Sequence, residues 1–200
     1  MDPAQASATD LRRVIDATFE EHRQVLAATM QALLPDIERA AGLLIEAYRA
    51  GGKAILFGNG GSMSDALHVE GELVNRFSVD RPGVAAVALS SPASFTATAN
   101  DYSYDDVFAR MLVAHARPHD LAIGFTTSGN SKNVVRAFEA AREQGLVTLA
   151  LTGEGGGACA RLVDLCLKVP SRHTPRIQEM HIIVGHVLCD LVERALFPRA

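Results

Sequence analysis

The 200-residue chain has three cysteines, no tryptophan and few aromatic residues, which make up 6% of the sequence. Cys159, Cys166 and Cys189 form no close C-x-x-C pair. An odd number of separated thiols favours reduced, buried side chains over a disulfide framework or a structural zinc site. We therefore expect a protein of a reducing compartment.

Long apolar runs and basic runs are also missing from the sequence. No apolar stretch approaches the roughly 18 residues of a membrane helix, and the first residues lack the pattern of a signal peptide. Lys and Arg number 19 against 23 Asp and Glu, for a formal net charge of -4, which argues against non-specific adhesion to nucleic acid or anionic membranes. We expect a soluble cytoplasmic protein with no nucleic-acid or membrane partner.

Nucleotide-binding motifs are incomplete. No G-x-x-x-x-G-K-[ST] pattern occurs, so P-loop chemistry has no support. The segment from Gly58 begins like the dinucleotide motif G-x-G-x-x-G, but Met63 replaces its last glycine. The segment 153–158 matches G-x-G-x-x-A in letters, yet too little chain follows it to complete a nucleotide-binding half-domain.

From residue 53 onward, short apolar runs alternate with helical segments, which predicts a parallel α/β sheet. The expected strands are 54–57, 84–89, 121–125, 148–151 and 165–169. The expected helices are 64–77, 94–99, 105–116, 133–144 and about 175–196, with a short turn at 158–162. We predict a single domain, 1–200, in which residues 53–200 form a three-layer α/β core with a five-stranded parallel sheet of flavodoxin-like order.

Two further helices, about 11–30 and 33–48, are expected before the first strand, with Gly51 and Gly52 ending the second. This helical pair, within 1–52, would serve packing or oligomerisation. The last helix is apolar around most of its circumference, and a chain of this length buries such a helix most simply in an oligomer.

The most informative stretch runs from Phe57 to Glu72. A buried strand leads into the glycine-rich turn Gly58–Ser62 and then a helix, an arrangement that exposes backbone N–H groups and suits an anion. His68 and Glu72 are four residues apart, so they share one face of that helix and can point at the same atom or metal ion.

A second polar loop, 126–131, follows the third expected strand and leads into another helix. Its hydroxyls and N–H groups could hold a phosphate without a lysine. Loops after the first and third strands flank the switch point of a flavodoxin-like sheet, where ligands bind. This coincidence favours phosphate binding over a plain helix cap.

Together these segments resemble the phosphoheptose isomerase family of SIS (sugar isomerase) domain proteins. The resemblance covers nearly the whole chain, from about residue 10 onward. Its motifs are Gly58–Ser62, Asp65, His68, Glu72, Asn100-Asp101, Thr127–Ser131, Leu151–Gly153 and Arg176–Glu179.

The resemblance implies isomerisation of sedoheptulose 7-phosphate to D-glycero-D-manno-heptose 7-phosphate, toward the nucleotide-activated heptose of lipopolysaccharide core or other glycans. It also implies a homotetramer with zinc at sites between subunits. By motif, Glu72 is the base and His186 the acid, and the metal ligands are His68, Glu72, Gln178 and His186. The phosphate is held by Thr126, Thr127, Ser128 and Ser131. The sugar is lined by Asn59, Gly60, Gly61, Ser62, Asn100 and Asp101, with Glu72 and Gln178 also contacting substrate.

Helix geometry qualifies this ligand set. Gln178 and His186 lie about 12 Å apart along one helix and about 80° apart around it, so we predict that they belong to different subunits' contributions or that only one ligates tightly. His181, three residues after Gln178, is a rival for the role of His186, but it projects about 140° away from His186. As a lone helical histidine it is expected to be a packing residue with satisfied hydrogen bonds.

The main alternative is a non-catalytic scaffold. The C-terminal segments 176–181 and 188–198 also resemble the DnaA-initiator-associating protein, an SIS-fold protein that binds the replication initiator. That relative lacks an acid and a histidine at the positions of Glu72 and His186, whereas this chain has both. The enzyme is therefore the favoured interpretation. A DNA-binding regulator is disfavoured because the N-terminal helices are too few for a separate DNA-binding domain.

Overall fold

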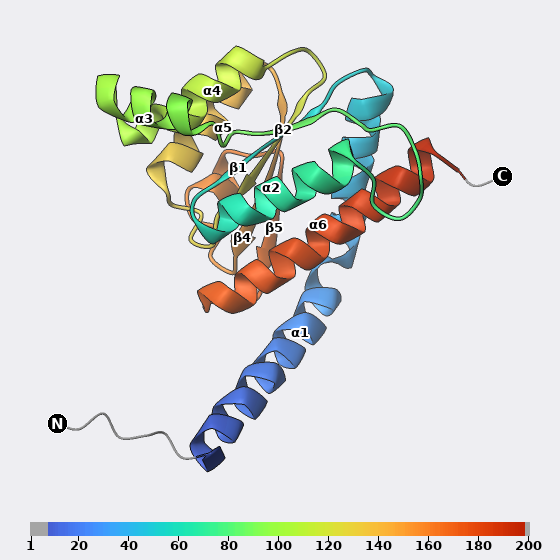
Figure 1. Ribbon diagram of the computed structural model, residues 1–200, viewed down its shortest axis with the longest axis vertical. Helices are drawn as coiled ribbons and strands as arrows, with labels where there is room; N and C mark the ends of the chain where they lie inside the picture. Colours follow the sequence, from blue (N-terminus) through green and yellow to red (C-terminus); the bar gives the residue numbers. More distant parts are fainter. Residues whose placement is uncertain (1–7, 199–200) are drawn as a thin grey trace.

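The computed structural model describes residues 8–198 (Figure 1). Five strands form one sheet: β1 (Ala54–Gly58), β2 (Ala86–Ala88), β3 (Leu121–Phe125), β4 (Val147–Gly153) and β5 (Leu165–Val169). The α-helices are α1 (Ala8–Arg49), α2 (Gly61–Val74), α3 (Pro92–Asp101), α4 (Val107–His115), α5 (Lys132–Glu143) and α6 (Thr174–Leu196). Two short 3-10 helices are η1 (Tyr104–Asp106) and η2 (Cys159–Arg161).

The sheet is entirely parallel, in the order β2-β1-β3-β4-β5. Ala54 of β1 pairs with both Ala86 of β2 and Leu121 of β3, which sets the register at the centre of the sheet. The predicted flavodoxin-like order is therefore confirmed. The loops after β1 and β3, which carry the expected ligand-binding motifs, leave adjacent strands at the same edge.

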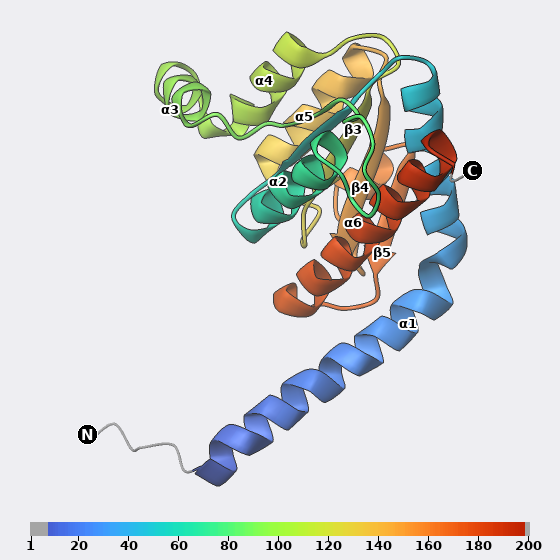
Figure 2. The ribbon, with the colours of Figure 1, turned by 45° about the vertical axis from the view of Figure 1, so that its right-hand side comes forward.

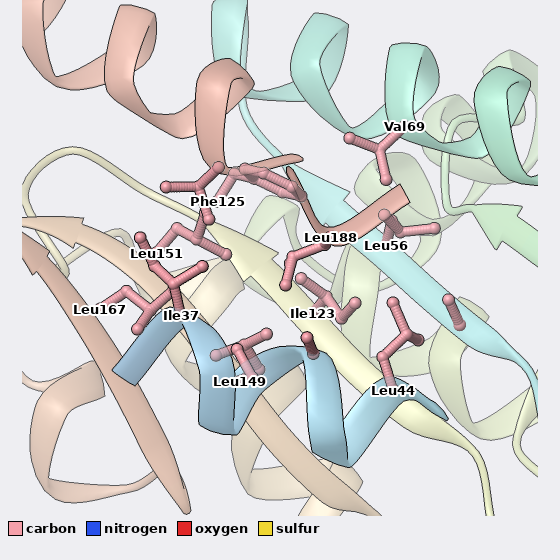
Figure 3. Packing of buried hydrophobic residues seen from close by; sticks show 14 of the residues in the cluster. Ile37, Leu44, Leu56, Val69, Ile123, Phe125, Leu149, Leu151, Leu167 and Leu188 are labelled. Carbon is pink, nitrogen blue, oxygen red and sulfur yellow. The ribbon is translucent and has the colours of Figure 1, made fainter. Parts of the chain in front are cut away.

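Alternation along the strands divides the core between the two faces of the sheet. Leu56 and its equivalents on the other strands pack under α1, α2 and α6, and Figure 3 shows Ile37 and Leu44 of α1 against Leu149 and Ile123. Neighbouring strand residues such as Phe57 point to the opposite face, where α4 and α5 cover them. Because successive strand residues point to opposite faces, each strand contributes side chains to the core on both sides of the sheet, as a three-layer fold requires.

The N-terminal segment differs from the prediction, because α1 is one continuous helix rather than a helical pair. Gln31 and Ala32, between the two predicted helices, are good helix formers and provide no break. Pro35 lies inside the helix, where it removes one backbone hydrogen bond without ending the element. The helix ends at Arg49, shortly before Gly51, which has a φ of 83° and was predicted together with Gly52 to stop it.

Only the C-terminal part of α1 packs on the sheet, through the cluster that contains Ile37 and Leu44. The N-terminal half extends away from the body of the fold (Figures 1 and 2). It leaves Leu11, Val14, Ile15 and Phe19 between 52% and 73% exposed. A helix with such an uncovered apolar face requires a partner surface to become fully buried.

Helix α6 begins at Thr174, with Pro175 in its first turn as predicted. It lies beside both α1 and α2 (Figure 2). Its inner face is buried, although Val187 stays 38% exposed in one chain. Among residues 8–198, no helix is both long enough and apolar enough to cross a membrane.

Candidate active site

The glycine-rich turn after β1 brings α2 directly to the sheet edge. Gly60 has a φ of 56°, a left-handed conformation that favours glycine. A Cβ on Gly61 would lie 2.5 Å from the Gln178 amide nitrogen, so the missing side chain admits Gln178 to the start of α2. The turn therefore joins the N-terminal ends of α2 and α6.

Two turns into α2, three side chains of the types that ligate metals meet within one chain. The Nε2 atoms of His186 and His68 are 2.9 Å apart, and Glu72 Oε1 is 3.4 Å from His68 Nε2. One donor atom from each residue fits within a 4.8 Å group. The predicted pairing of α2 with the last helix is thus present, because α2 and α6 run side by side (Figure 1).

Gln178 lies elsewhere. Its amide packs against Gly61, which precedes His68 by seven residues, or about 10 Å along α2. Within one chain, therefore, His186 joins His68 while the Gln178 amide lies at the other end of the helix pair. This placement agrees with the helix-geometry argument that the two residues do not bind one ion equally from one chain.

The second polar loop, after β3, is held in shape by its own hydroxyls. Gly129 N–H donates to Thr126 Oγ1 over 3.2 Å, and Asn130 N–H donates to Ser128 Oγ over 3.1 Å. Ser131 is the N-cap of α5 but makes no side-chain capping bond, so its hydroxyl remains available to a ligand. Thr126 is buried and mainly braces the loop, whereas Ser128 is exposed.

A glycine-rich segment at the end of β4 packs against this loop. Gly129 has a φ of 65°, and a Cβ on it would lie 2.1 Å from the Gly156 carbonyl oxygen. Cys159 N–H also donates to the Gly129 carbonyl over 3.0 Å. The segment that matches a cofactor motif in letters therefore serves as a brace for the loop after β3.

A reciprocal amide pair connects the turn after β1 with the start of α5, beside the loop after β3. Asn59 Nδ2 donates to Asn133 Oδ1, and Asn133 Nδ2 donates to Asn59 Oδ1, each over 2.9 Å. Tyr104 O–H donates to the same Asn59 oxygen over 3.1 Å. Sequence analysis missed Asn133 and Tyr104. Asn133 follows Ser131 in the polar loop's helix, which was the available signal, whereas nothing in the sequence marks Tyr104.

Tyr104 and Asn59 line an open cavity of about 310 Å³ at this edge of the sheet. The other residues that line it are Gly58, Gly60, Met63, Leu67, Ser90 and Phe95. Asn100 and Asp101, which were also expected near the sugar, lie exposed at the C-terminal end of α3 and hydrogen-bond to each other over 2.8 Å. Of the side chains around the end of α3, it is Tyr104 that hydrogen-bonds to the glycine-rich turn, through Asn59.

Two buried or half-buried titratable groups flank the site. Burial raises the pKa of Asp65 to about 6, against a smaller opposite effect of His68, and its Oδ2 has no hydrogen-bond partner among the described residues. Burial lowers the pKa of His181 to about 4. His181 Nε2 lies 3.2 Å from the Thr152 carbonyl oxygen, so His181 is a buried packing residue, as predicted, but its Nδ1 has no hydrogen-bond partner among the described residues.

Comparison with known proteins decides the family. The SIS domain model matches residues 19–153. Phosphoheptose isomerase of Aneurinibacillus thermoaerophilus is 47% identical over 186 residues, which is 90% of this chain and 94% of that protein. The chain belongs to the phosphoheptose isomerase family of SIS domain proteins.

Solved structures of phosphoheptose isomerases have the same fold over nearly their whole length. The enzyme from Neisseria gonorrhoeae superposes with a TM-score of 0.87 at 36% identity, covering 92% of this chain and 98% of that one. The enzyme from Francisella tularensis gives 0.88 at 35% identity, covering 91% and 97%. The SIS domain match contains both ligand-binding loops and α2, while α6, with His186, follows it.

Proposed function

We propose that the protein is an aldose-ketose isomerase that converts sedoheptulose 7-phosphate to D-glycero-D-manno-heptose 7-phosphate. The observation that carries this proposal is the convergence of His68, Glu72 and His186 within one chain, in a protein 47% identical to a phosphoheptose isomerase. A scaffold that only binds the replication initiator needs no such set of acid, base and ligand groups.

The reaction moves two protons. C1 loses a proton while the carbonyl oxygen on C2 gains one, which gives an enediol; C2 then gains a proton and the oxygen on C1 loses one. We assign the carbon-bound proton to Glu72 as base and the oxygen-bound proton to His186 as acid. His186 Nε2 lies 2.9 Å from His68 Nε2. A ring nitrogen that ligates a metal ion carries no proton, so the roles of His186 as acid and as metal ligand compete.

The donor set fits a zinc ion. Two imidazole nitrogens and a carboxylate oxygen are a common three-ligand set of catalytic zinc, which keeps a fourth position for water or substrate. His68, Glu72 and His186 would hold the ion, and Gln178 of another subunit would be a fourth ligand, so that substrate would bind by displacing it or by expansion to five ligands. When bound, zinc would polarise the substrate oxygens and stabilise developing negative charge. A ligating Glu72 is a weaker base, so its two roles compete.

Substrate binding is divided between the two loops. Thr126, Thr127, Ser128 and Ser131 would hold the phosphate at the start of α5, where N–H groups and the helix dipole favour an anion. Asn59, Gly60, Gly61 and Ser62 would line the sugar beside the 310 Å³ cavity. The amide pair between Asn59 and Asn133 keeps the two ends of this site at a fixed separation.

The assembly belongs to the same proposal. We assign the protein to a cytoplasmic homotetramer with sites at subunit interfaces, in the supply of nucleotide-activated heptose for lipopolysaccharide core or other glycans. The uncovered apolar face of α1 supports self-association. The exposed positions of Asn100, Asp101 and Val187 support contributions to or contacts with a neighbouring subunit.

Incubation of the purified protein with sedoheptulose 7-phosphate, with and without a chelator, tests the function directly. We expect the aldose to form, chelation to stop its formation, and Zn²⁺ to restore it. Turnover that resists chelation would leave Glu72 and His186 as an acid-base pair without metal. Absence of turnover, together with tight initiator binding, would favour the scaffold instead.

A further inference from the structure

A buried ion pair that the reaction itself does not use joins the segment between α2 and β2 to helix α6. Arg81 Nε donates to Glu193 Oε2 over 3.0 Å, and their side chains are only 2% and 4% exposed. A buried ion pair is expensive unless its remaining hydrogen-bonding capacity is also satisfied. Both partners meet this condition, and they do so with groups that lead to the candidate active site.

The guanidinium of Arg81 caps the C-terminal end of α2. Its Nη2 donates to the carbonyl oxygen of Glu72 over 2.9 Å, and its Nη1 donates to that of Leu73 over 2.8 Å. The last carbonyls of a helix have no partner within the helix, so a planar fork of donors there fixes the final turn. One of these two carbonyls belongs to the proposed catalytic base.

The carboxylate of Glu193 accepts hydrogen bonds from three consecutive backbone N–H groups in the segment that follows α2. Oε2 accepts from Phe77 N–H over 3.0 Å, and Oε1 accepts from the N–H groups of Ser78 and Val79 over 2.9 Å each. Burial alone would raise the pKa of Glu193, but these N–H groups and Arg81 together lower it. The carboxylate is therefore held charged, as the centre of a folded loop.

This loop places an aromatic ring against the proposed acid. The Phe77 ring centroid is 5.8 Å from that of His186. The His68 ring also contacts the His186 ring, with their centroids 5.0 Å apart. Glu193 follows His186 by seven residues on α6, which returns it to the same face about two turns further on. The ion pair thus links the peptide of Glu72 to the helix of His186.

We propose that Arg81 and Glu193 are positioning residues of the active site. They hold the end of α2 at a fixed distance from α6 and keep Phe77 against the His186 ring, so that the His68, Glu72 and His186 donors converge before any ligand arrives. Neither residue touches the reacting atoms. The expected effect of these residues on catalysis rests on the proposed function. Their effect on the placement of the His186 ring does not.

Three variants separate positioning from bulk stability. Glu193→Gln keeps the shape of the acceptor but removes the charge, Arg81→Lys keeps the charge but loses the fork to the carbonyls, and Phe77→Leu removes the ring. Arg194→Ala is the matched control, because it breaks the exposed Arg194–Asp190 pair on the same helix. Circular dichroism and melting curves establish which variants fold, and Arg81→Lys replaces Glu193→Gln if the latter does not.

The first measurement is the NMR signal of His186 in metal-free protein labelled with ¹³C at histidine Cε1. We expect Phe77→Leu to remove a ring-current shift, and Glu193→Gln or Arg81→Lys to move the signal toward the Phe77→Leu position. An unchanged His186 signal in a folded Glu193→Gln or Arg81→Lys variant overturns the proposal. This outcome is decided whether or not the protein is an isomerase.

The second measurement is Zn²⁺ affinity by competition with a chelating dye, followed by kcat and KM. We expect a loss of about 10- to 100-fold in affinity for the positioning variants, the range found for residues that orient metal ligands, and a lower kcat with little change in KM. Arg194→Ala should match the wild type. Unchanged Zn²⁺ affinity and kcat in folded variants would show that the pair serves stability alone. A wild type without turnover would instead overturn the proposed function.

Discussion

Asn59 and Asn133 satisfy each other's side-chain amides across the two ligand-binding loops, through two hydrogen bonds of 2.9 Å. Asn133 is 2% exposed, and its Oδ1 also accepts from Val134 N–H over 2.9 Å. The turn after β1 and the start of α5 are therefore bonded directly to each other. If these loops hold the sugar and the phosphate as we propose, the amide pair sets the separation of the two subsites.

The amide pair leads to a first prediction. Asn133→Ala should lower the free energy of unfolding by about 1–3 kcal/mol, because it leaves buried partners without hydrogen bonds, and it should lower kcat/KM for sedoheptulose 7-phosphate. Tyr104→Phe removes a single, exposed hydrogen bond and should cost only about 0.5–1.5 kcal/mol. Urea unfolding and steady-state kinetics measure both. Unchanged kcat/KM in Asn133→Ala would show that the pair has no part in substrate binding.

The proposed base can be tested without disturbing the fold. Glu72→Gln keeps the volume of the side chain but cannot accept the carbon-bound proton, so isomerisation should fall by at least about 100-fold. Glu139→Gln, on the exposed side of α5, is the control and should keep full activity. Circular dichroism and gel filtration should match the wild type for both. Full turnover by Glu72→Gln would move the role of base to another residue.

The buried, neutral state of His181 predicts a dependence of stability on pH. Its pKa falls from 6.5 to about 4 on folding, so between these values the unfolded chain binds the extra proton. Stability from this group is complete above about pH 6.5 and is lost as the pH falls toward 4, with a loss of about 2 kcal/mol at pH 5.

Urea unfolding at pH 5 and pH 7 measures this contribution. The difference between the two pH values should shrink by about 2 kcal/mol in His181→Asn, while His115→Asn, an exposed histidine at the end of α4, should behave as the wild type does. An equal pH dependence in His181→Asn and wild type would contradict the assignment of a neutral buried imidazole.

The exposed face of α1 predicts a change in assembly. Phe19 and Ile15 are 73% and 52% exposed in one chain, so Phe19→Ser combined with Ile15→Ser should reduce the apparent mass in analytical ultracentrifugation. Arg13→Ser, on the opposite side of the same helix, should leave the mass unchanged. A double variant with the wild-type mass would show that self-association uses another surface.

Much of the architecture could be predicted from local patterns. The strands were located because each is a short apolar run between helical segments. The predicted flavodoxin-like order, whose switch point the polar loops after the first and third strands flank, is confirmed. The break in α1 was wrongly predicted because an apolar period that drifts around a long helix resembles two short helices.

The site was predictable only where its residues share an element or a motif. His68 and Glu72 are one helical turn apart, so their common face follows from sequence spacing. The approach of His186 to them came from the family resemblance, and the division of Gln178 and His186 between subunits stays a prediction. Tyr104 and the Arg81–Glu193 pair depend on how a loop returns across the fold, and long-range packing of this kind leaves no periodic signal.

The contact between Gly129 and Gly156 gives a different meaning to a familiar pattern of letters. The backbones of two loops touch there, since a Cβ on Gly129 would lie 2.1 Å from the Gly156 carbonyl oxygen. The two segments therefore share one steric constraint, and neither can acquire a side chain at this point unless the other retreats. These contacts fall on Gly156 and Gly157, which occupy x positions of the G-x-G-x-x-A letters, so the steric constraint on this segment is independent of its likeness to a nucleotide-binding motif.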